Sequence, residues 1–326
     1  MSLVLASSVS ALEGARPIAV VKGDDGALRG HVLGVRDALA ESPTRRKPSA
    51  SLLGGKLRAA GVHAGARTTR DLLAAAAAVD LHAEAELDDE GERAFALAKE
   101  TLSGPRRAKE VTLPAFAHFE PIPTTVPSDR DVIYVASPAG GGKTVYISQW
   151  ALKYRRLWPD RKVFIASANT VADDPAWLAL PPAARPLQID VATIFSEAVD
   201  VATAFPGACL VILDDLIDAK DGKQAKAVLR FAQDLLQIGR RHGLSVLITS
   251  HELTSYSRTR AILHDCHSVV VFPHHTPRHS LSYFMRKLFG GDAELPRLKA
   301  WGSRWVQLSV RSPQWALGEH QACTIE

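Results

Sequence analysis

Five short apolar runs recur in the second half of the chain, and two of them end in polar or charged residues. The first run opens the segment 132–144, and the other four are residues 162–168, 209–215, 245–251 and 268–272. Continuous apolar runs of this length are typical of parallel strands that are buried on both faces. Amphipathic patterns with helical spacing at 145–158 and 225–240 separate them. The pattern predicts an α/β domain with a central, mostly parallel sheet.

The first 125 residues have a different composition. They are rich in Ala, Gly, Ser and Arg and almost free of aromatic residues before Phe95. Such a segment buries little apolar area, so we expect an N-terminal extension that is partly disordered or folds on a partner. Strong helix formers at 70–79 and 84–102 predict two local helices. Four prolines predict a stiff, extended linker into the second domain, 126–326: Pro114, Pro121, Pro123 and Pro127.

Charge and cysteine content narrow the class of protein. The net charge of +4 permits an anionic partner without requiring one. Cys209, Cys266 and Cys323 are far apart and have no metal-ligand spacing, so we expect reduced thiols in a cytosol-like compartment. No apolar run is long enough to span a bilayer, which predicts a soluble protein without a membrane span.

A glycine-rich turn, SPAGGGKT, follows the first apolar run. Glycines leave the backbone N–H groups free to wrap a β-phosphate, and the next helix points its positive end at the same oxygens. Lys143 then reaches the β- and γ-phosphates, and the hydroxyl of Thr144 ligates Mg²⁺. A chance glycine-rich turn is the alternative. The predicted ATP-binding segment consists of Ser137, Pro138, Ala139, Gly140, Gly141, Gly142, Lys143, Thr144 and Val145, with Ser137 where the usual motif has Gly.

Two carboxylates end the third apolar run, CLVILDD. A core strand of an open α/β sheet delivers such acids to the edge where ligands bind, which is the Walker B pattern. Asp214 would hold Mg²⁺, and Asp215 would orient or deprotonate the attacking water. The alternative is an Asp-Asp helix cap.

The fourth run, SVLITSH, ends in Ser250 and His251. In P-loop ATPases with an additional strand, this strand lies between the P-loop and Walker B strands, which would bring either side chain near the γ-phosphate. His251 would then sense the phosphate or position water. Equally, it would only hydrogen-bond the end of its strand.

After residue 273 the chain becomes basic, and aromatic residues are interleaved with the charges. Basic groups beside aromatic rings suit a surface that tracks DNA, because phosphate contacts give affinity that is independent of sequence. We expect most of these aromatics to pack in the core and the charges to remain candidates for DNA contact.

Four segments, SPAGGGKT, LVILDD, RRHGLSVLITSH and HSVVVFP, together with the basic tail, resemble the HerA/FtsK superfamily of P-loop motors. Within it they are similar to the poxvirus-type DNA-packaging ATPases of large nucleocytoplasmic DNA viruses. The resemblance implies a three-layer, RecA/ASCE-like P-loop NTPase fold and ATP hydrolysis with Mg²⁺ that drives double-stranded DNA. It also implies a homo-oligomeric ring, usually hexameric, a virion or viral-factory location, and capsid or virion contacts through the N-terminal extension.

The family also implies an arginine that completes the neighbouring subunit's site. Four arginines flank the fourth run and are candidates for this role: Arg240, Arg241, Arg258 and Arg260. Relatives often have Glu at the position of Asp215, and the shorter side chain predicts slow hydrolysis. Two other functions stay open: a nucleotide-binding virion or scaffold protein with little or no turnover, and another P-loop NTPase or a kinase.

Overall fold

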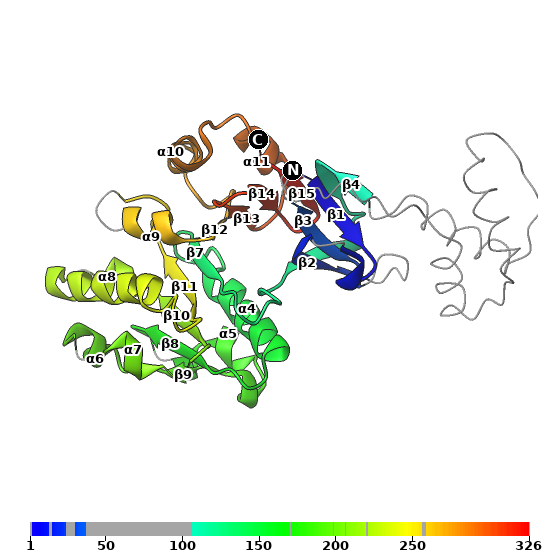
Figure 1. Ribbon diagram of the computed structural model, residues 1–326. Helices are drawn as coiled ribbons and strands as arrows, with labels where there is room; N and C mark the ends of the chain where they lie inside the picture. Colours follow the sequence, from blue (N-terminus) through cyan, green and yellow to red (C-terminus); the bar gives the residue numbers. More distant parts are fainter. Residues whose placement is uncertain are drawn as a thin grey trace, which may run out of the picture.

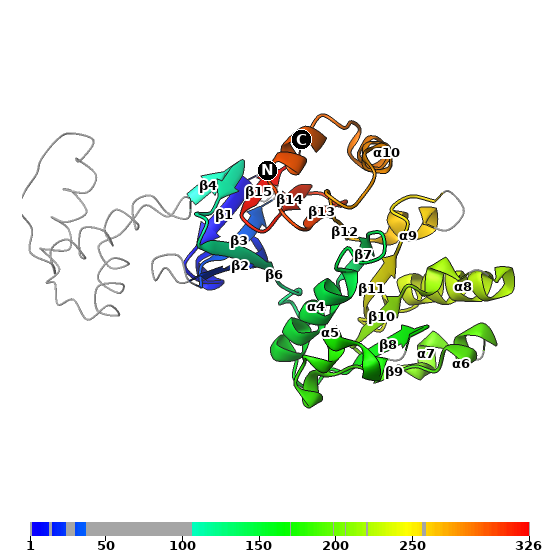
Figure 2. The same ribbon diagram turned by 180° about the vertical axis from the view of Figure 1, so that it is seen from behind.

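The computed structural model describes residues 2–12, 15–23, 30–36, 106–169, 171–197, 199–205, 207–219, 221–255 and 259–325 (Figures 1 and 2). Its strands form two sheets. A ten-stranded sheet has the order β5-β15-β14-β13-β12-β7-β11-β10-β8-β9, and a five-stranded sheet has the order β4-β1-β3-β2-β6.

The parallel half of the large sheet is made of the five apolar runs. Its strands are β7 (Val132–Ala136), β8 (Val163–Ser167), β10 (Leu210–Asp214), β11 (Ser245–Ser250) and β12 (Ser268–Val271), followed at the edge by β9 (Leu187–Gln188). All residues of β7, β10, β11 and β12 are buried, as expected for strands covered on both faces. Strand β11 pairs with both β7 and β10, which confirms the predicted position of the sensor strand.

Helices cover both faces of this parallel half. Helix α4 (Lys143–Leu157) packs Ile147 and Tyr154 against Ile133 of β7, whereas α8 (Gly222–Gln237) packs Val228 on the face that carries Tyr134. Adjacent residues of β7 point to opposite faces, so the strand contributes to both cores. The predicted three-layer α/β fold is confirmed.

Shorter helical elements complete this part of the chain. They are α5 (Pro175–Leu178), α6 (Val191–Phe195), α7 (Val201–Ala204), α9 (Arg260–Asp265), α10 (Arg278–Phe289) and α11 (Leu295–Ala300). The 3-10 turns are η1 (Ser10–Leu12), η3 (Val171–Asp173), η4 (Pro182–Ala184) and η5 (Leu216–Asp218). Trp177 of α5 is buried. Among the described residues, no helix is both long and apolar enough to cross a membrane.

Antiparallel strands extend the large sheet beyond β12. They are β13 (Val306–Ser309), β14 (Trp315–Leu317), β15 (Gln321–Thr324) and β5 (Glu110–Thr112). The aromatic side chains of this C-terminal third are largely core, as expected: Phe284 and Trp315 are buried, although Tyr283 is exposed.

The small sheet was not predicted. It contains β1 (Ser2–Ala6), β2 (Arg16–Gly23), β3 (Val32–Arg36), β4 (Arg106–Ala108) and β6 (Ala117–Pro121), all paired antiparallel. Leu3, Val21 and Phe119 pack in one core with Trp315 and Leu317 of β14. The expectation that this part buries little apolar area is therefore wrong for these strands, and residues 117–121 are a strand rather than part of an extended linker. The two helices predicted at 70–79 and 84–102 lie outside the described residues.

Candidate nucleotide-binding site

Three adjacent parallel strands end at the same edge of the large sheet. Strand β7 leads into Ser137 and the glycine-rich loop, β10 into Asp214 and Asp215, and β11 into His251. Because the strands are parallel and in register, residues far apart in the sequence meet at this edge.

The loop needs glycine at three positions, for different structural reasons. Gly140 and Gly142 have φ values of 76° and 100°, in the left-handed region that other residues rarely adopt. Gly141 has no such torsion, but a Cβ there would lie 1.7 Å from the Oγ of Ser137. Helix α4 starts directly after Gly142 without a side-chain cap, which leaves its first N–H groups directed at the loop. The loop therefore has the conformation and donors that a phosphate needs.

Ser137 takes the usual glycine position at an ordinary, negative φ: among the described residues, the non-glycines with positive φ are Glu197 and Asp215. Its backbone N–H donates to the carbonyl of Ser250 at 3.1 Å, which joins the loop to β11. The Oγ of Ser137 is buried and has no hydrogen-bond partner. A serine thus fits here, but at the cost of an unpaired hydroxyl beneath Gly141.

Lys143 is the centre of the site. Its Nζ donates to the carbonyl oxygen of Ser137 at 2.8 Å and lies 3.6 Å from Oδ1 of Asp215 and 3.1 Å from Nδ1 of His251. The side chain is only 5% exposed. The structure therefore brings together three of the predicted catalytic residues, which come from three different strand ends.

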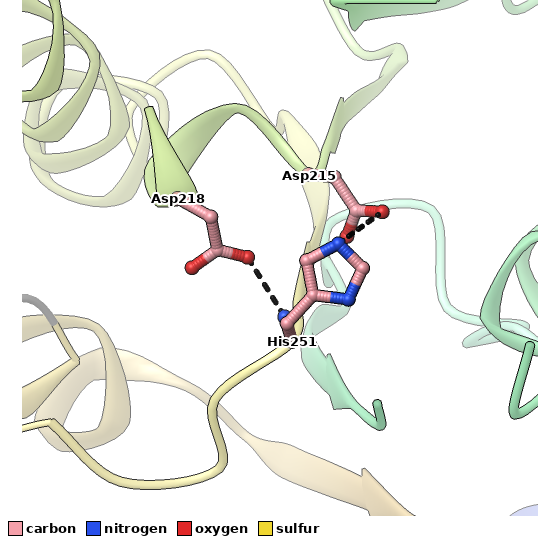
Figure 3. A group of neighbouring side chains, drawn as sticks. All are labelled: Asp215, Asp218 and His251. Carbon is pink, nitrogen blue, oxygen red and sulfur yellow. Dashed lines mark hydrogen bonds and ion pairs between the residues drawn. The ribbon is translucent and has the colours of Figure 1, made fainter. Parts of the chain in front are cut away.

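The contacts of His251 favour one tautomer. An ammonium group can only donate, so Nδ1 of His251 accepts from Lys143 and carries no proton. The proton is then on Nε2, which lies 3.3 Å from Oδ2 of Asp215 (Figure 3). In this arrangement a neutral imidazole connects the lysine to the second carboxylate of the Walker B strand.

A threonine links the two carboxylates. Oγ1 of Thr249 lies 2.8 Å from Oδ1 of Asp214 and 3.0 Å from Oδ1 of Asp215, and it accepts from the backbone N–H of Asp215 at 2.8 Å. The hydroxyl has one proton, so it donates to one carboxylate at a time. Asp215 itself has a φ of 54°, a strained value for a non-glycine that is found preferentially at functional sites.

Burial raises the pKa of Asp214, and the nearby Asp215 raises it further, while the hydrogen bond from Thr249 opposes the shift. Two carboxylates with one shared hydroxyl donor form an oxygen-rich group whose negative charge a divalent cation would offset. The residues present therefore fit Mg²⁺, with Asp214 and the hydroxyl of Thr144, next to Lys143 at the start of α4, as the candidate ligands.

Asp218, in η5, holds the end of β11. Its two carboxylate oxygens accept from Oγ of Ser250 at 2.9 Å and from the backbone N–H of His251 at 2.7 Å. Asp215, Asp218 and His251 each offer a ligand atom within 4.8 Å of the others, yet the imidazole points toward Asp215 and away from Asp218 (Figure 3). Because both oxygens of Asp218 are engaged, we assign it to positioning His251.

A hollow of about 420 Å³ lies next to this cluster. Ser137 and His251 line one side of it, and Thr276, Pro277 and Ser280, at the start of α10, line the other. The first turn of α10 therefore borders the same side of the loop as the Lys143–Asp215–His251 group.

The arginine candidates lie elsewhere. Arg240 and Arg241 are exposed in the turn between α8 and β11, at the edge of the sheet where the parallel strands begin. They do not meet Lys143, so within one copy of the chain they are separate from the site. Arg260 begins α9, and Arg258 lies outside the described residues.

Sequence reasoning missed Thr249 and Asp218. Thr249 was visible as a hydroxyl residue within an otherwise apolar run, and Asp218 as an acid soon after the Walker B pair. Neither position indicates a role until the pairing of β10 with β11 brings their side chains together.

No protein-family model matches the chain. A relative, "Uncharacterized protein V3" of Sputnik virophage, is 27% identical over 211 residues, which cover 64% of this chain and 81% of the relative. Similar solved structures include B204, the DNA-packaging ATPase from Sulfolobus turreted icosahedral virus, at 13% identity and a TM-score of 0.42, covering 59% of this chain and 98% of B204. Another is the pCW3 conjugation coupling protein TcpA with ATPγS, at 12% identity and a TM-score of 0.38, covering 67% of this chain and 66% of TcpA.

Proposed function

We propose that this chain is an ATPase that uses ATP hydrolysis to move double-stranded DNA, as in genome packaging. The observation that carries the proposal is the group of Lys143, Asp215 and His251, held within 3.6 Å of one another beside a loop built for phosphate. A glycine-rich loop alone would support nucleotide binding. The addition of a carboxylate and an imidazole supports hydrolysis.

Each group in the site has a separate role in the proposed reaction. The loop N–H groups and Lys143 bind the β- and γ-phosphates and stabilise the charge that develops during phosphoryl transfer. Mg²⁺, held by Thr144 and Asp214, would neutralise phosphate charge when bound. Asp215 accepts a hydrogen bond from the attacking water, and the neutral His251 orients that carboxylate through Nε2–H.

The DNA surface of the proposal is the exposed face of α10. Its exposed residues recur at helical spacing and are mostly basic or aromatic: Arg278, His279, Tyr283, Arg286 and Lys287. Arg286 is partly neutralised by Asp292 at 3.1 Å. Because the start of α10 borders the hollow beside His251, a change at the phosphates has a short route to this surface.

The arginine geometry supports an oligomer. Arg240 and Arg241 lie at the opposite edge of the sheet from Lys143, so a role in hydrolysis requires that they act on a neighbouring copy. A head-to-tail ring places one edge of each copy against the site of the next. We include this homo-oligomeric ring in the proposal.

The test is ATP turnover by the full chain with and without duplex DNA, in the wild type and in Lys143→Ala and Asp214→Asn. We expect DNA to stimulate turnover in the wild type, and both variants to lose about 10²–10³-fold in rate, because each removes charge stabilisation at the phosphates. Sedimentation of the same samples with ATP reports the ring. Turnover that persists in Lys143→Ala would contradict the ATPase assignment.

A second function remains, a nucleotide-binding virion or scaffold protein. The observation in its favour is that Asp215 is shorter than the glutamate of many relatives and is already engaged by Lys143 and His251. Tight ATP binding without turnover, with DNA present, would favour this function over the motor.

A further inference from the structure

A second hollow, of about 210 Å³, lies on the other side of the glycine-rich loop. Most of its lining comes from helix α4, strand β6 of the small sheet and the segment that leads into β13, and Phe272 and Glu319 add to it from two other segments. Its lining includes His118 and Glu120 of β6, Val145 and Gln149 of α4, and the consecutive residues Arg304 and Trp305.

The loop indicates which part of a nucleotide would reach this hollow. Lys143, which binds the β- and γ-phosphates, points to the side where Asp215 and His251 lie. The 210 Å³ hollow instead borders Gly142 and Val145, at the start of α4. Because the phosphates form a linear chain, a γ-phosphate beside Lys143 directs the sugar and base away from His251, toward this second hollow.

The walls suit a planar, aromatic group. Trp305 is only partly buried, and its ring is fixed by an edge-to-face contact with Tyr146, at 5.5 Å between ring centroids and 65° between planes. Stacking of one base on such a ring contributes about 1–3 kcal/mol. Val145 is 51% exposed beside it, so an apolar surface faces the hollow from α4 as well.

Hydrogen-bonding groups are available around the ring. The carboxylate of Glu319 is oriented by the backbone N–H of Arg304 at 2.9 Å, which leaves its other oxygen to accept from an exocyclic amine. The side chain of Gln149 is exposed and both donates and accepts. A few polar groups around an apolar surface are typical of small-molecule sites.

Strand β6 is anchored on both sides of the hollow. Its Phe119 donates its backbone N–H to the carbonyl of Glu319 at 2.7 Å, and Nζ of Lys153 on α4 donates to the carbonyl of Pro121 at 3.2 Å. Lys153 also lies 3.9 Å from the carboxylate of Glu120. The small sheet therefore supplies a fixed outer wall to a hollow whose inner wall is the P-loop helix.

We propose that this hollow binds the base of the nucleoside triphosphate, stacked on Trp305, with the N-terminal small sheet as its outer wall. The inference rests on the proposed ATPase function and names the nucleoside side of the same site. It makes the small sheet part of the ATP site rather than an appendage to it.

The test compares ATP with inorganic tripolyphosphate, which has the phosphates but no base. Calorimetric titration of the full chain gives Kd for both ligands in the wild type, in Trp305→Leu, and in Trp158→Leu as a control. Trp158 lies at the far end of α4, where Arg161 stacks over its ring. We expect Trp305→Leu to weaken ATP binding about tenfold or more and to leave tripolyphosphate binding unchanged. Trp158→Leu should change neither.

A second variant covers the case in which loss of Trp305 prevents folding. Gln149→Trp places a bulky ring in the hollow from an exposed position on α4, and Gln233→Trp places the same ring on an exposed position of α8. Gln149→Trp should weaken ATP but not tripolyphosphate, and Gln233→Trp should weaken neither. Wild-type ATP affinity in both Trp305→Leu and Gln149→Trp would overturn the inference.

Lys143→Ala separates this inference from the proposed function. Without the ammonium group, both ATP and tripolyphosphate should bind more weakly. If Lys143→Ala binds both ligands as the wild type does, the phosphate site itself is wrong. If only the Trp305 and Gln149 variants behave as the wild type, the phosphate site stands and the base lies elsewhere.

Discussion

The parallel strands carry similar charged groups at their two ends, the edge of the sheet where they begin and the edge where they finish, but the groups make different contacts there. At the edge where the strands end, Asp214, Asp215 and Lys143 meet around a glycine-rich loop. At the edge where they begin, Arg130 and Asp131 precede β7. Each edge therefore has a buried carboxylate, Asp214 or Asp131, and a cation, so charge alone does not distinguish a candidate site from a structural contact.

Where the parallel strands begin, the hydrogen bonds of Arg130 and Asp131 each include a backbone group, and Asp131 also lies 3.6 Å from the guanidinium of Arg16. Oδ2 of Asp131 accepts from the backbone N–H of Thr124 at 2.7 Å, and its own N–H donates to Oγ of Ser245 at 3.1 Å. The guanidinium of Arg130 donates to the carbonyls of Leu235 and Leu236, at 3.3 and 2.5 Å. These groups satisfy chain ends and turns, so they fix the sheet against α8 and the linker segment.

Where the strands end, Lys143 donates to the carbonyl of Ser137, but its contacts with Asp215 and His251 join side chains to one another. Asp215 and His251 contact each other and Lys143, and they remain 26% and 43% exposed. A ligand can therefore replace these side-chain contacts, whereas the backbone hydrogen bonds of Arg130 and Asp131 are part of the fold. Side-chain partners that a ligand can replace, rather than the number of charges, therefore distinguish the candidate site from the structural contacts.

The largest expected effect concerns Asp131, at the end of the sheet where the parallel strands begin. Burial raises the pKa of Asp131 from 3.8 to about 6, so the folded chain holds a proton in a pH range where the unfolded chain has lost it. The contribution of Asp131 to stability is complete below the unfolded pKa and is lost as the pH rises through the folded one, by about 3 kcal/mol in total.

We expect Asp131→Asn to remove this dependence, because the amide has no proton to lose in that range. Urea denaturation of the wild type and the variant between about pH 4 and about pH 7 measures it as the difference between the two curves. The wild type should lose stability relative to the variant as the pH rises. Two curves that run parallel would show that Asp131 does not titrate in this way.

The next effect concerns Thr249, at the end of the sheet where the strands finish. Thr249→Val removes the hydroxyl that links Asp214, Asp215 and the backbone N–H of Asp215, while the side-chain volume is kept. Because both carboxylates lose the group that orients them, ATP turnover should fall about 10–100-fold. Thr249→Ser keeps the hydroxyl and should restore most of the rate. Turnover at the wild-type level in Thr249→Val would mean that the carboxylates are positioned by other contacts.

The smallest effect concerns the buried hydroxyl of Ser137, which has no hydrogen-bond partner. Ser137→Ala removes a buried Oγ without a partner and leaves the backbone unchanged, so the free energy of unfolding should rise by about 1 kcal/mol. Ser148→Ala is the matched control, because that buried hydroxyl donates to the carbonyl of Val145 at 3.0 Å. Thermal unfolding of both variants without nucleotide measures the difference. Destabilisation in Ser137→Ala would indicate that its hydroxyl has a structural role.

Sequence reasoning succeeded where the chemistry is contiguous. The turn before Lys143, the Asp214–Asp215 pair and the run that ends at His251 each combine an apolar strand with a polar end in a few residues. Parallel pairing then follows from the apolar character of all three strands. The order of β7, β11 and β10 could be expected for this reason together with the resemblance to P-loop ATPases.

Sequence reasoning failed where partners are distant. The short runs SLVLA and IAVV were visible as possible strands, but the polar, Gly-rich composition of residues 1–125 as a whole concealed them. Both runs pair with the nearby β3, but their other strand partners, β4 and β6, lie in residues 106–121. No local pattern therefore indicates the core that Leu3 and Phe119 share with Trp315. The exact contacts of Thr249 and Asp218 depend in the same way on long-range pairing.

The way in which residues 106–121 are shared between the sheets affects how the protein can be shortened. Strands β4 and β6 belong to the small sheet, while β5 between them is the edge strand of the large one. A fragment that began at residue 126 would lose β5 and the whole small sheet, and the apolar side chains of Trp315 and Leu317 would face solvent. Such a fragment would be prone to aggregate, so the N-terminal strands belong in any recombinant version of this protein.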